Sequence, residues 1–202
     1  MTRRTSISVR VVAVLLLAAG LSARQSLTKQ DSESMLRKLN AIESRGAQPP
    51  SKDAKPVRTS FTEREVNAYF KYDGQAHLPV GVASPEVVIA DNGKLEGKAV
   101  VDLDAVRKAQ SSAMLDLVAL FTSSVEVHAY GRLETKDGKG TFVLDRATVG
   151  GIGVPKSVLQ SVVSHYSRTP DQPNGFDLDK PFDLPAAIRA VELQRGTAVI
   201  VQ

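Results

Sequence analysis

The residues best suited to acid–base or metal chemistry in this 202-residue chain are three histidines, His77, His128 and His165. Zinc sites usually draw on closely spaced histidines or cysteines, whereas these histidines are far apart and the chain has no cysteine. His128 alternates with Glu126 and Tyr130, a pattern typical of the solvated face of a strand. The sequence therefore predicts no metal site and no catalytic histidine.

Other clusters of polar or small residues also lack the pattern of a known reactive site. Asp177, Asp179 and Asp183 occur without the glycine turn and terminal glutamate of a calcium loop. The glycine-rich run from Gly150 to Pro155 lacks the Lys-Ser/Thr pair of a phosphate-binding loop, and no G-x-S-x-G serine elbow is present. We therefore expect no catalytic residue and no cofactor, and we do not expect an enzyme.

The first 23 residues have the features of a secretory signal peptide. Three arginines precede an apolar run from Val11 to Ala19, and a short exit segment ends at Ala23. The apolar run is shorter than the about 20 residues that a membrane-spanning helix needs. The sequence predicts a periplasmic or otherwise exported protein, cleaved after Ala23. If the signal stays uncleaved, the chain is anchored in the inner membrane.

The charge of the chain is unevenly distributed. Residues 24–58 hold eight basic and four acidic residues, a net charge of +4, whereas residues 59–202 hold 15 basic and 18 acidic residues, a net charge of −3. A nucleic-acid-binding domain would carry its basic excess on the folded part. The charge distribution therefore argues against nucleic acid as a partner.

Residues 24–46 are predicted to form an amphipathic helical arm, and residues 47–57 a Pro-rich linker. Apolar residues recur at helical spacing between Asp31 and Arg45. The linker contains three prolines and almost no apolar residue, which is typical of an extended segment. Because the arm is basic, it is a candidate for contact with a membrane surface. It is also the candidate docking element of a protein-interaction module.

An α+β binding domain is expected over residues 58–202, and it should open with a capped helix. Thr62 and Glu65 have the spacing of a capping box, and Phe61 and Val66 that of a hydrophobic staple. A helix of about ten residues should follow and end at Asp73.

Three predicted β-hairpins alternate with helices along this domain. Strands with alternating apolar residues flank the turns at 91–93, 136–140 and 195–196. Helical spacing recurs over residues 104–121 and after Pro155, and residues 169–180 read as a surface excursion. The expected fold is α+β, a curled antiparallel sheet built from these hairpins and enclosing an apolar groove.

The two later helices carry the residues that we expect to line the groove. Each helix has a stripe of apolar side chains at helical spacing. The candidate ligand-binding residues are Leu117, Leu120, Phe121, Val158, Leu159, Val162 and Val163. An apolar groove with few polar contacts is suited to an apolar ligand.

Three segments of the domain resemble the LmeA-like exported proteins of bacteria. They are Phe61–Ala68, then Gly151–Pro155 opening a helix, then Phe182–Pro185 with Ile188 before the last hairpin. The resemblance covers about Val57 to Gln202. It implies a tubular-lipid-binding type of fold and the binding of phospholipid or glycolipid in the cell envelope, without catalysis.

Two functions follow from these observations. The first is a non-catalytic exported envelope protein that binds an apolar ligand, with the lipid class taken from the resemblance. The alternative is a periplasmic protein-interaction module with no small-molecule ligand, which would meet its partner through the arm.

Overall fold

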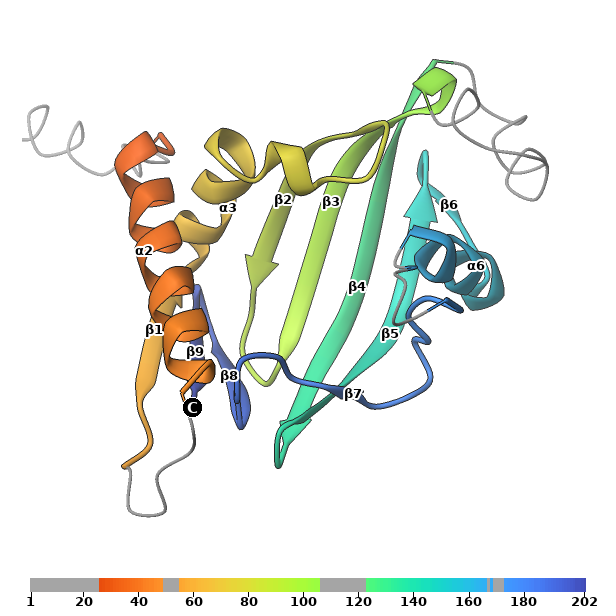
Figure 1. Cartoon of the computed structure of the whole chain (residues 1–202). Helices are drawn as coiled ribbons and strands as arrows, with labels where there is room; N and C mark the ends of the chain where they lie inside the picture. Colours follow the sequence, from red (N-terminus) through yellow and green to blue (C-terminus); the bar gives the residue numbers. More distant parts are fainter. Residues whose placement is uncertain (1–25, 49–54, 106–122, 167, 169–172) are drawn as a thin grey trace, which may run out of the picture.

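The computed structural model describes residues 26–48, 55–105, 123–166, 168 and 173–202 (Figure 1). The predicted signal peptide, most of the linker, most of the helix expected over 104–121 and part of the 169–180 excursion lie outside the described residues. The described helices are α2 (Lys29–Gly46), α3 (Glu63–Tyr72), the short 3-10 helix η1 (Gln75–His77) and α6 (Lys156–Tyr166). The strands are β1 (Arg58–Thr62), β2 (Val82–Ile89), β3 (Lys94–Asp102), β4 (Ser124–Lys136), β5 (Lys139–Val149), β6 (Ile152–Gly153), β7 (Phe182–Asp183), β8 (Ala190–Gln194) and β9 (Thr197–Val201).

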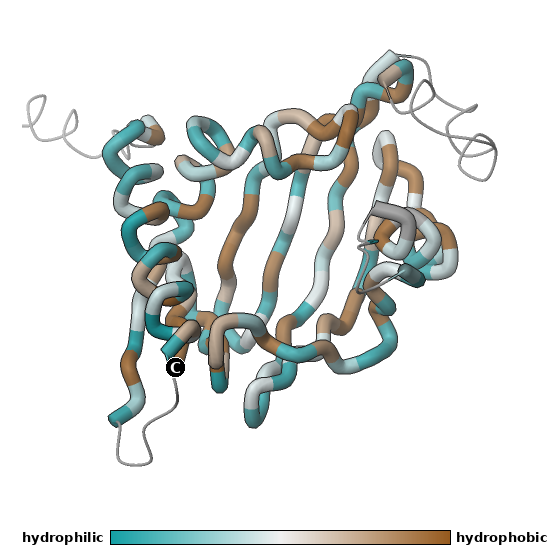
Figure 2. The backbone as a smooth tube through the Cα atoms, viewed as in Figure 1, coloured by the Kyte–Doolittle hydropathy of each residue, from teal (hydrophilic) through white to brown (hydrophobic). Residues whose placement is uncertain are grey.

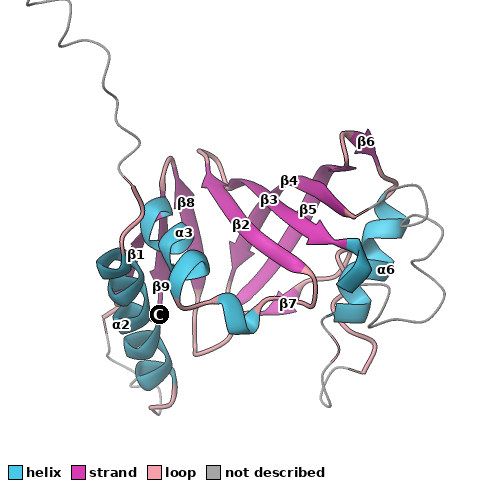
Figure 3. Ribbon diagram, turned by 90° about the horizontal axis from the view of Figure 1, so that it is seen from above, coloured by secondary structure: helices cyan, strands magenta, loops and turns pink. Residues whose placement is uncertain are grey.

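The strands form two antiparallel sheets. The larger has the order β2-β3-β4-β5-β6, with β7 paired to β5. The smaller has the order β1-β9-β8. The larger sheet is open and curled (Figure 3), and the α+β class with a curled antiparallel sheet is confirmed. A single sheet was expected, but the last hairpin pairs with β1 instead, because Arg58–Thr62 is a strand that the alternation did not reveal.

The three predicted hairpins are present, and the central one is longer than expected. β4 and β5 continue to Lys136 and Lys139, so that only Asp137 and Gly138 form the turn. Both turn residues have positive φ, 51° and 78°, as a two-residue turn between twisted strands requires. The backbone N–H of Gly138 donates to the carbonyl of Arg189, which fixes the hairpin tip against the chain leading into β8.

The predicted capping box at the start of α3 is confirmed. The hydroxyl of Thr62 accepts from the backbone N–H of Glu65 at 3.1 Å, and the Glu65 carboxylate accepts from the backbone N–H of Thr62 at 2.9 Å. One turn later, the Asn67 side chain bonds both the N–H and the carbonyl of Val87. Together with Glu63, which accepts from the N–H of Ile89, it satisfies the free edge of β2.

Helix α2 forms where the arm was expected, and it packs against α3 and β1 (Figure 1). Ile42 and Ser32 are buried in this contact. Lys38 forms an ion pair of 2.7 Å with Glu65, which also accepts from the Ser34 hydroxyl. The inner face of α2 is therefore occupied by the domain itself.

The described end of the 169–180 excursion returns to the interior, contrary to the expectation of a surface loop. Leu178 is only 6% exposed. Its backbone N–H donates to the Gln160 side chain at 2.8 Å. Burial of this one leucine anchors the polar segment to α6. The prolines and aspartates around it are typical of a surface loop and give no sign of the anchor.

Within the described residues, no helix has the length and apolar content needed to cross a membrane.

Candidate functional site

The larger sheet has one face made almost entirely of apolar and small residues. Strand register places β3 and β4 residues in pairs on this face, and β2 and β5 extend it. We call it the apolar face, and its central residues are Leu95, Gly97, Ala99 and Val101 on β3 with Val125, Val127, Ala129 and Gly131 on β4. Val87 continues it onto β2 and Ala147 onto β5.

The apolar face is buried at its margins and only half-buried in its middle. Ile89, Leu103 and Ala147 are each 3% exposed, and Leu103 packs with Val125 in a small core cluster. Ala99, Val127 and Ala129 are half-buried. In Figures 1 and 2, α3 lies at the β2 edge and α6 in front of β5, and the described helices leave the middle strands uncrossed.

The described structure leaves room above Gly97 on this face. Apart from its chain neighbours, no heavy atom of the described structure lies within 4 Å of the position that a Cβ atom would take there. Gly131, on the same face, differs. A Cβ atom there would lie 2.5 Å from the Phe142 ring and 2.6 Å from the Val143 carbonyl. The sheet is therefore closely packed at Gly131 and unpacked at Gly97.

The opposite face of the sheet is charged. Lys98 pairs with Glu86 at 2.9 Å, and Arg132 with Asp145 at 3.7 Å. His128 lies on this face as the alternation predicts, 2.6 Å from the Glu126 carboxylate. The hydrogen bond from His128 lowers the pKa of Glu126. In the part of the chain that the structure describes, no group of three or more acidic or histidine side chains is arranged to hold a metal ion.

The sequence-predicted ligand-binding residues are only partly described. Val158, Leu159 and Val163 are half-buried on α6, which lies in front of β5 (Figure 1). Val162 is in the same helix, but its side chain is outside the described set. Leu117, Leu120 and Phe121 are outside the described residues altogether. The contact expected between the two stripes therefore stays a prediction.

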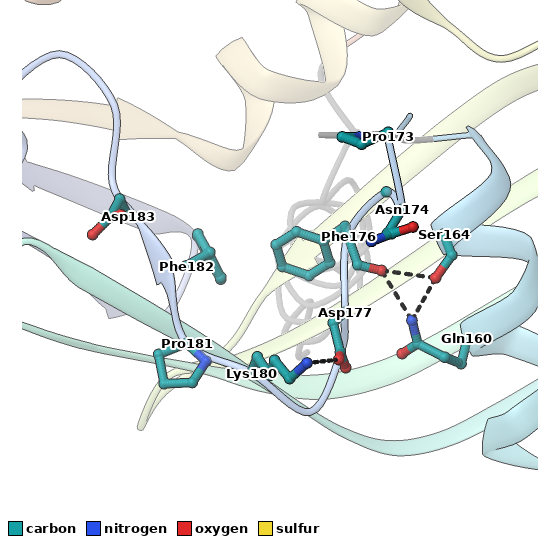
Figure 4. A pocket seen from close by; sticks show the side chains of 11 residues that line it. Gln160, Ser164, Pro173, Asn174, Phe176, Asp177, Lys180, Pro181, Phe182 and Asp183 are labelled. Atoms are coloured by element: carbon teal, nitrogen blue, oxygen red, sulfur yellow. Dashed lines mark hydrogen bonds and ion pairs between the residues drawn. The ribbon is translucent and has the colours of Figure 1, made fainter. Parts of the chain in front are cut away.

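A cavity of about 470 Å³ lies between α6 and the chain of residues 173–183 (Figure 4). The rings of Phe176 and Phe182 face each other inside it, with centroids 4.9 Å apart and an angle of 63°. Gln160 and Ser164 of α6 form one wall, where both side chains donate to the carbonyl of Phe176. Of the predicted stripe residues, the three whose side chains the structure describes, Val158, Leu159 and Val163, do not line this cavity.

Carboxylates and a single lysine give the cavity its charge. Lys180 lies 3.1 Å from Asp177, and Asp183 lies 2.7 Å from Lys139 of β5. The backbone N–H of Asp179 and, next, the side chain of Lys180 hold the pKa of Asp177 below its usual range. The Asp177 carboxylate is therefore ionised at neutral pH.

Sequence reasoning noticed Phe182 as part of a motif but did not place it in a site. Its ring lies on the apolar face, because a Cβ atom at Gly140 of β5 would meet it at 2.6 Å. Phe176 and Gln160 carried no signal, since a lone aromatic in a Pro- and Asp-rich loop and a polar residue beside a helical stripe are both common. Only the fold brings these three side chains together.

In the alternative function, a protein-interaction module, the partner would bind residues 24–46. The described part of this segment buries Ile42 and forms two ion pairs with α3, Lys38 with Glu65 and Asp31 with Arg64. A partner would therefore have to bind the outer face of α2, which is polar.

Comparison with known proteins adds little to this geometry. No family model and no curated protein matches the chain. Among solved structures, the chain is similar to a lipopolysaccharide binding protein, with 15% sequence identity over 77% of this chain and a TM-score of 0.25. The matched region spans 45% of that protein's length. A likeness at this TM-score carries no argument, and the resemblance to LmeA-like proteins stays a prediction.

Proposed function

We propose that this chain is an exported, non-catalytic envelope protein that binds the acyl part of a phospholipid or glycolipid on the apolar face of its larger sheet. The observation that carries the proposal is the open space over Gly97, in the middle of a face that bears no charge and is closed at both margins.

The composition of this face suits a linear hydrocarbon chain. Gly97, Ala99 and Ala129 are small, so they leave a shallow floor, while Leu95 and Val127 are larger and stand beside them. Each methylene group removed from water contributes about 0.8 kcal/mol, so several methylenes on this floor suffice for stable binding. The described residues leave the middle of this face half-buried, so a ligand would remove further apolar surface from water there.

The charged groups of the domain support a non-catalytic role. His128 is bonded to Glu126 on the opposite face of the sheet, and Glu65 is held by Lys38 between α2 and α3. Both arrangements stabilise the fold and lie away from the apolar face. Export is supported by the signal-like pattern of residues 1–23.

Native mass spectrometry of the protein isolated from a cell envelope tests the proposal. The wild-type protein should carry a lipid-sized adduct or take up added phosphatidylglycerol or glycosyl diacylglycerol. Gly97→Trp fills the open position and should abolish the adduct. Val88→Trp is the matched control, because Val88 is 38% exposed on the opposite face and its replacement should leave the adduct in place.

Thermal unfolding followed by circular dichroism shows whether both variants are folded. A wild-type protein that is free of lipid and takes up neither lipid would contradict the proposal. Equal lipid content in the two folded variants would also contradict it, because binding would then not use the apolar face.

A further inference from the structure

We propose that the cavity beside α6 binds a neutral glycosyl group, so that the preferred ligand is a glycolipid rather than an anionic phospholipid. This inference rests on the proposed function, because it assigns the polar end of the same ligand. Four features carry it: the position of the cavity, its charge, its aromatic rings and its size.

The cavity adjoins the apolar face through a shared side chain. Phe182 lines the cavity, and the same ring covers Gly140 on the apolar side of β5. β7 holds Phe182 there by pairing with β5, with Gly140 opposite Phe182 in the register. An acyl chain on the sheet would therefore have its headgroup at this end of the face.

The charge of the cavity is unsuited to a phosphate. Among the described lining residues, the charged side chains are Asp177, Asp183 and Lys180, and Asp183 is paired at 2.7 Å with Lys139 of β5 outside the lining. Lys180 is already paired with Asp177. A phosphate diester would meet two carboxylates with no unengaged cation among the lining residues, and like charges at short range oppose binding.

The same side chains are well suited to a sugar. Hydroxyl groups can donate to the carboxylates of Asp177 and Asp183 and bond the amide of Asn174, which costs no charge burial. The Asp183 side chain is 86% exposed and is therefore accessible to a ligand. The apolar C–H surface of a pyranose ring can pack on Phe176 and Phe182, which line the cavity in edge-to-face contact with each other (Figure 4).

The size of the cavity is also sufficient. Its volume of about 470 Å³ lies within the range of about 300–1,000 Å³ that is usual for small-molecule sites. Gln160, by contrast, bonds the backbone of Phe176 and Leu178, so it shapes the wall and is a positioning residue.

Extraction from vesicles with matched acyl chains tests the inference. The three vesicle lipids are glucosyl diacylglycerol, phosphatidylglycerol and plain diacylglycerol, each diluted in phosphatidylcholine. We expect the wild-type protein to bind the glucosyl lipid about tenfold more tightly than either other lipid, a difference of about 1.4 kcal/mol.

Two variants should shift this preference toward phosphatidylglycerol by about tenfold. Asp183→Lys reverses one lining charge, and Asn174→Lys adds a cation without removing an ion pair described above. Asp145→Lys is the control, because it makes the same charge change on the opposite face, where Asp145 pairs with Arg132. The control should keep the wild-type preference.

The outcomes separate the two proposals. Binding of the glucosyl lipid no tighter than phosphatidylglycerol or diacylglycerol would overturn the glycosyl assignment and leave acyl binding intact. Competition by free glucosylglycerol as strong as by the intact lipid would also overturn it, since the cavity would then serve a free sugar. No binding of any of the three lipids would overturn the proposed function itself.

Discussion

The two faces of the larger sheet are built from the same strands but have opposite chemistry. On one face, Gly97 and Ala99 lie beside Ala129 and Val127 with no charge among them. On the other, Lys98 and its neighbours form ion pairs in contact with solvent. Because side chains alternate along a strand, a single sequence specifies both faces, and a register shift of one residue would exchange them.

The two faces differ in how much a bound ligand could stabilise them. The charged face forms its own ion pairs, Lys98 with Glu86 and Arg132 with Asp145. The described residues cover the apolar face at Leu103 and at Ile89 but not at Gly97, so its middle is the place where a ligand can still remove apolar surface from water.

Truncation at the covered margin of the apolar face should be costly. Leu103→Ala removes a side chain that is packed against Val125, and the loss should be about 2–5 kcal/mol of unfolding free energy. Val88→Ala on the charged face should cost less than about 0.5 kcal/mol. Urea unfolding measures both. Similar losses at the two positions would show that the faces do not differ in burial.

A buried carboxylate should matter more than the exposed ones. Burial on its own raises the pKa of Glu65, but hydrogen bonds from Lys38, Ser34 and the Thr62 backbone together lower it below its ordinary value. At pH 7, Glu65→Gln should therefore lower the free energy of unfolding by about 1.5–3 kcal/mol, because it removes the charged acceptor of these hydrogen bonds.

The same carboxylate makes this contribution depend on pH. Since the folded pKa lies below the unfolded one, the stabilisation is fully present above the unfolded pKa and is lost as the pH falls through the folded pKa. The difference between the wild type and Glu65→Gln should accordingly shrink toward zero in strong acid. A difference that stays constant from pH 7 downward would contradict this explanation of the α2 contact.

Two glycines on the apolar face should respond to alanine with opposite signs. Gly131→Ala forces a methyl group against the Val143 carbonyl and should destabilise the protein by about 1–3 kcal/mol. Gly97→Ala meets open space and should stabilise it by about 0.5–1 kcal/mol, since glycine inside a strand is unfavourable. Thermal and urea unfolding would measure the pair. Destabilisation at both positions would mean that the space over Gly97 is filled.

Ion pairs on the charged face should contribute least. Lys98→Ala breaks the exposed pair with Glu86, and it should change stability by less than about 1 kcal/mol. Added salt should reduce even this difference. If Lys98→Ala lowered stability by more at high salt than at low salt, the charged face would have a structural role beyond its ion pairs.

Local patterns predicted the secondary structure well. The central hairpin and the capping box at Thr62 are each determined by residues a few positions apart, and both are confirmed, although the turn predicted at 136–140 is limited to Asp137 and Gly138. The separate small sheet was not predicted, because β1 pairs Arg58 with Val201 across most of the domain. Pairing at such a sequence distance leaves no local signal.

The sequence placed the candidate site on two helices, whereas the proposed site lies on the strands of the larger sheet. Helical spacing identified the stripe of α6 with Leu159, yet spacing shows only which side of a helix is apolar and says nothing of what it meets. The small residues Gly97 and Ala129 read simply as members of alternating strands. Their importance follows from the space above them, and that space depends on how the helices are placed over the sheet.

The most direct test of the central claim is to locate the bound acyl chain by methyl NMR. A nuclear Overhauser effect between an acyl proton and a methyl group of the protein is observed only when the two lie close together. We expect contacts to Ala99, Val127 and Ala129 on the apolar face, and none to Val88 or Val100 on the charged face. Contacts to Val88 or Val100, with none to Ala99 or Ala129, would contradict the account.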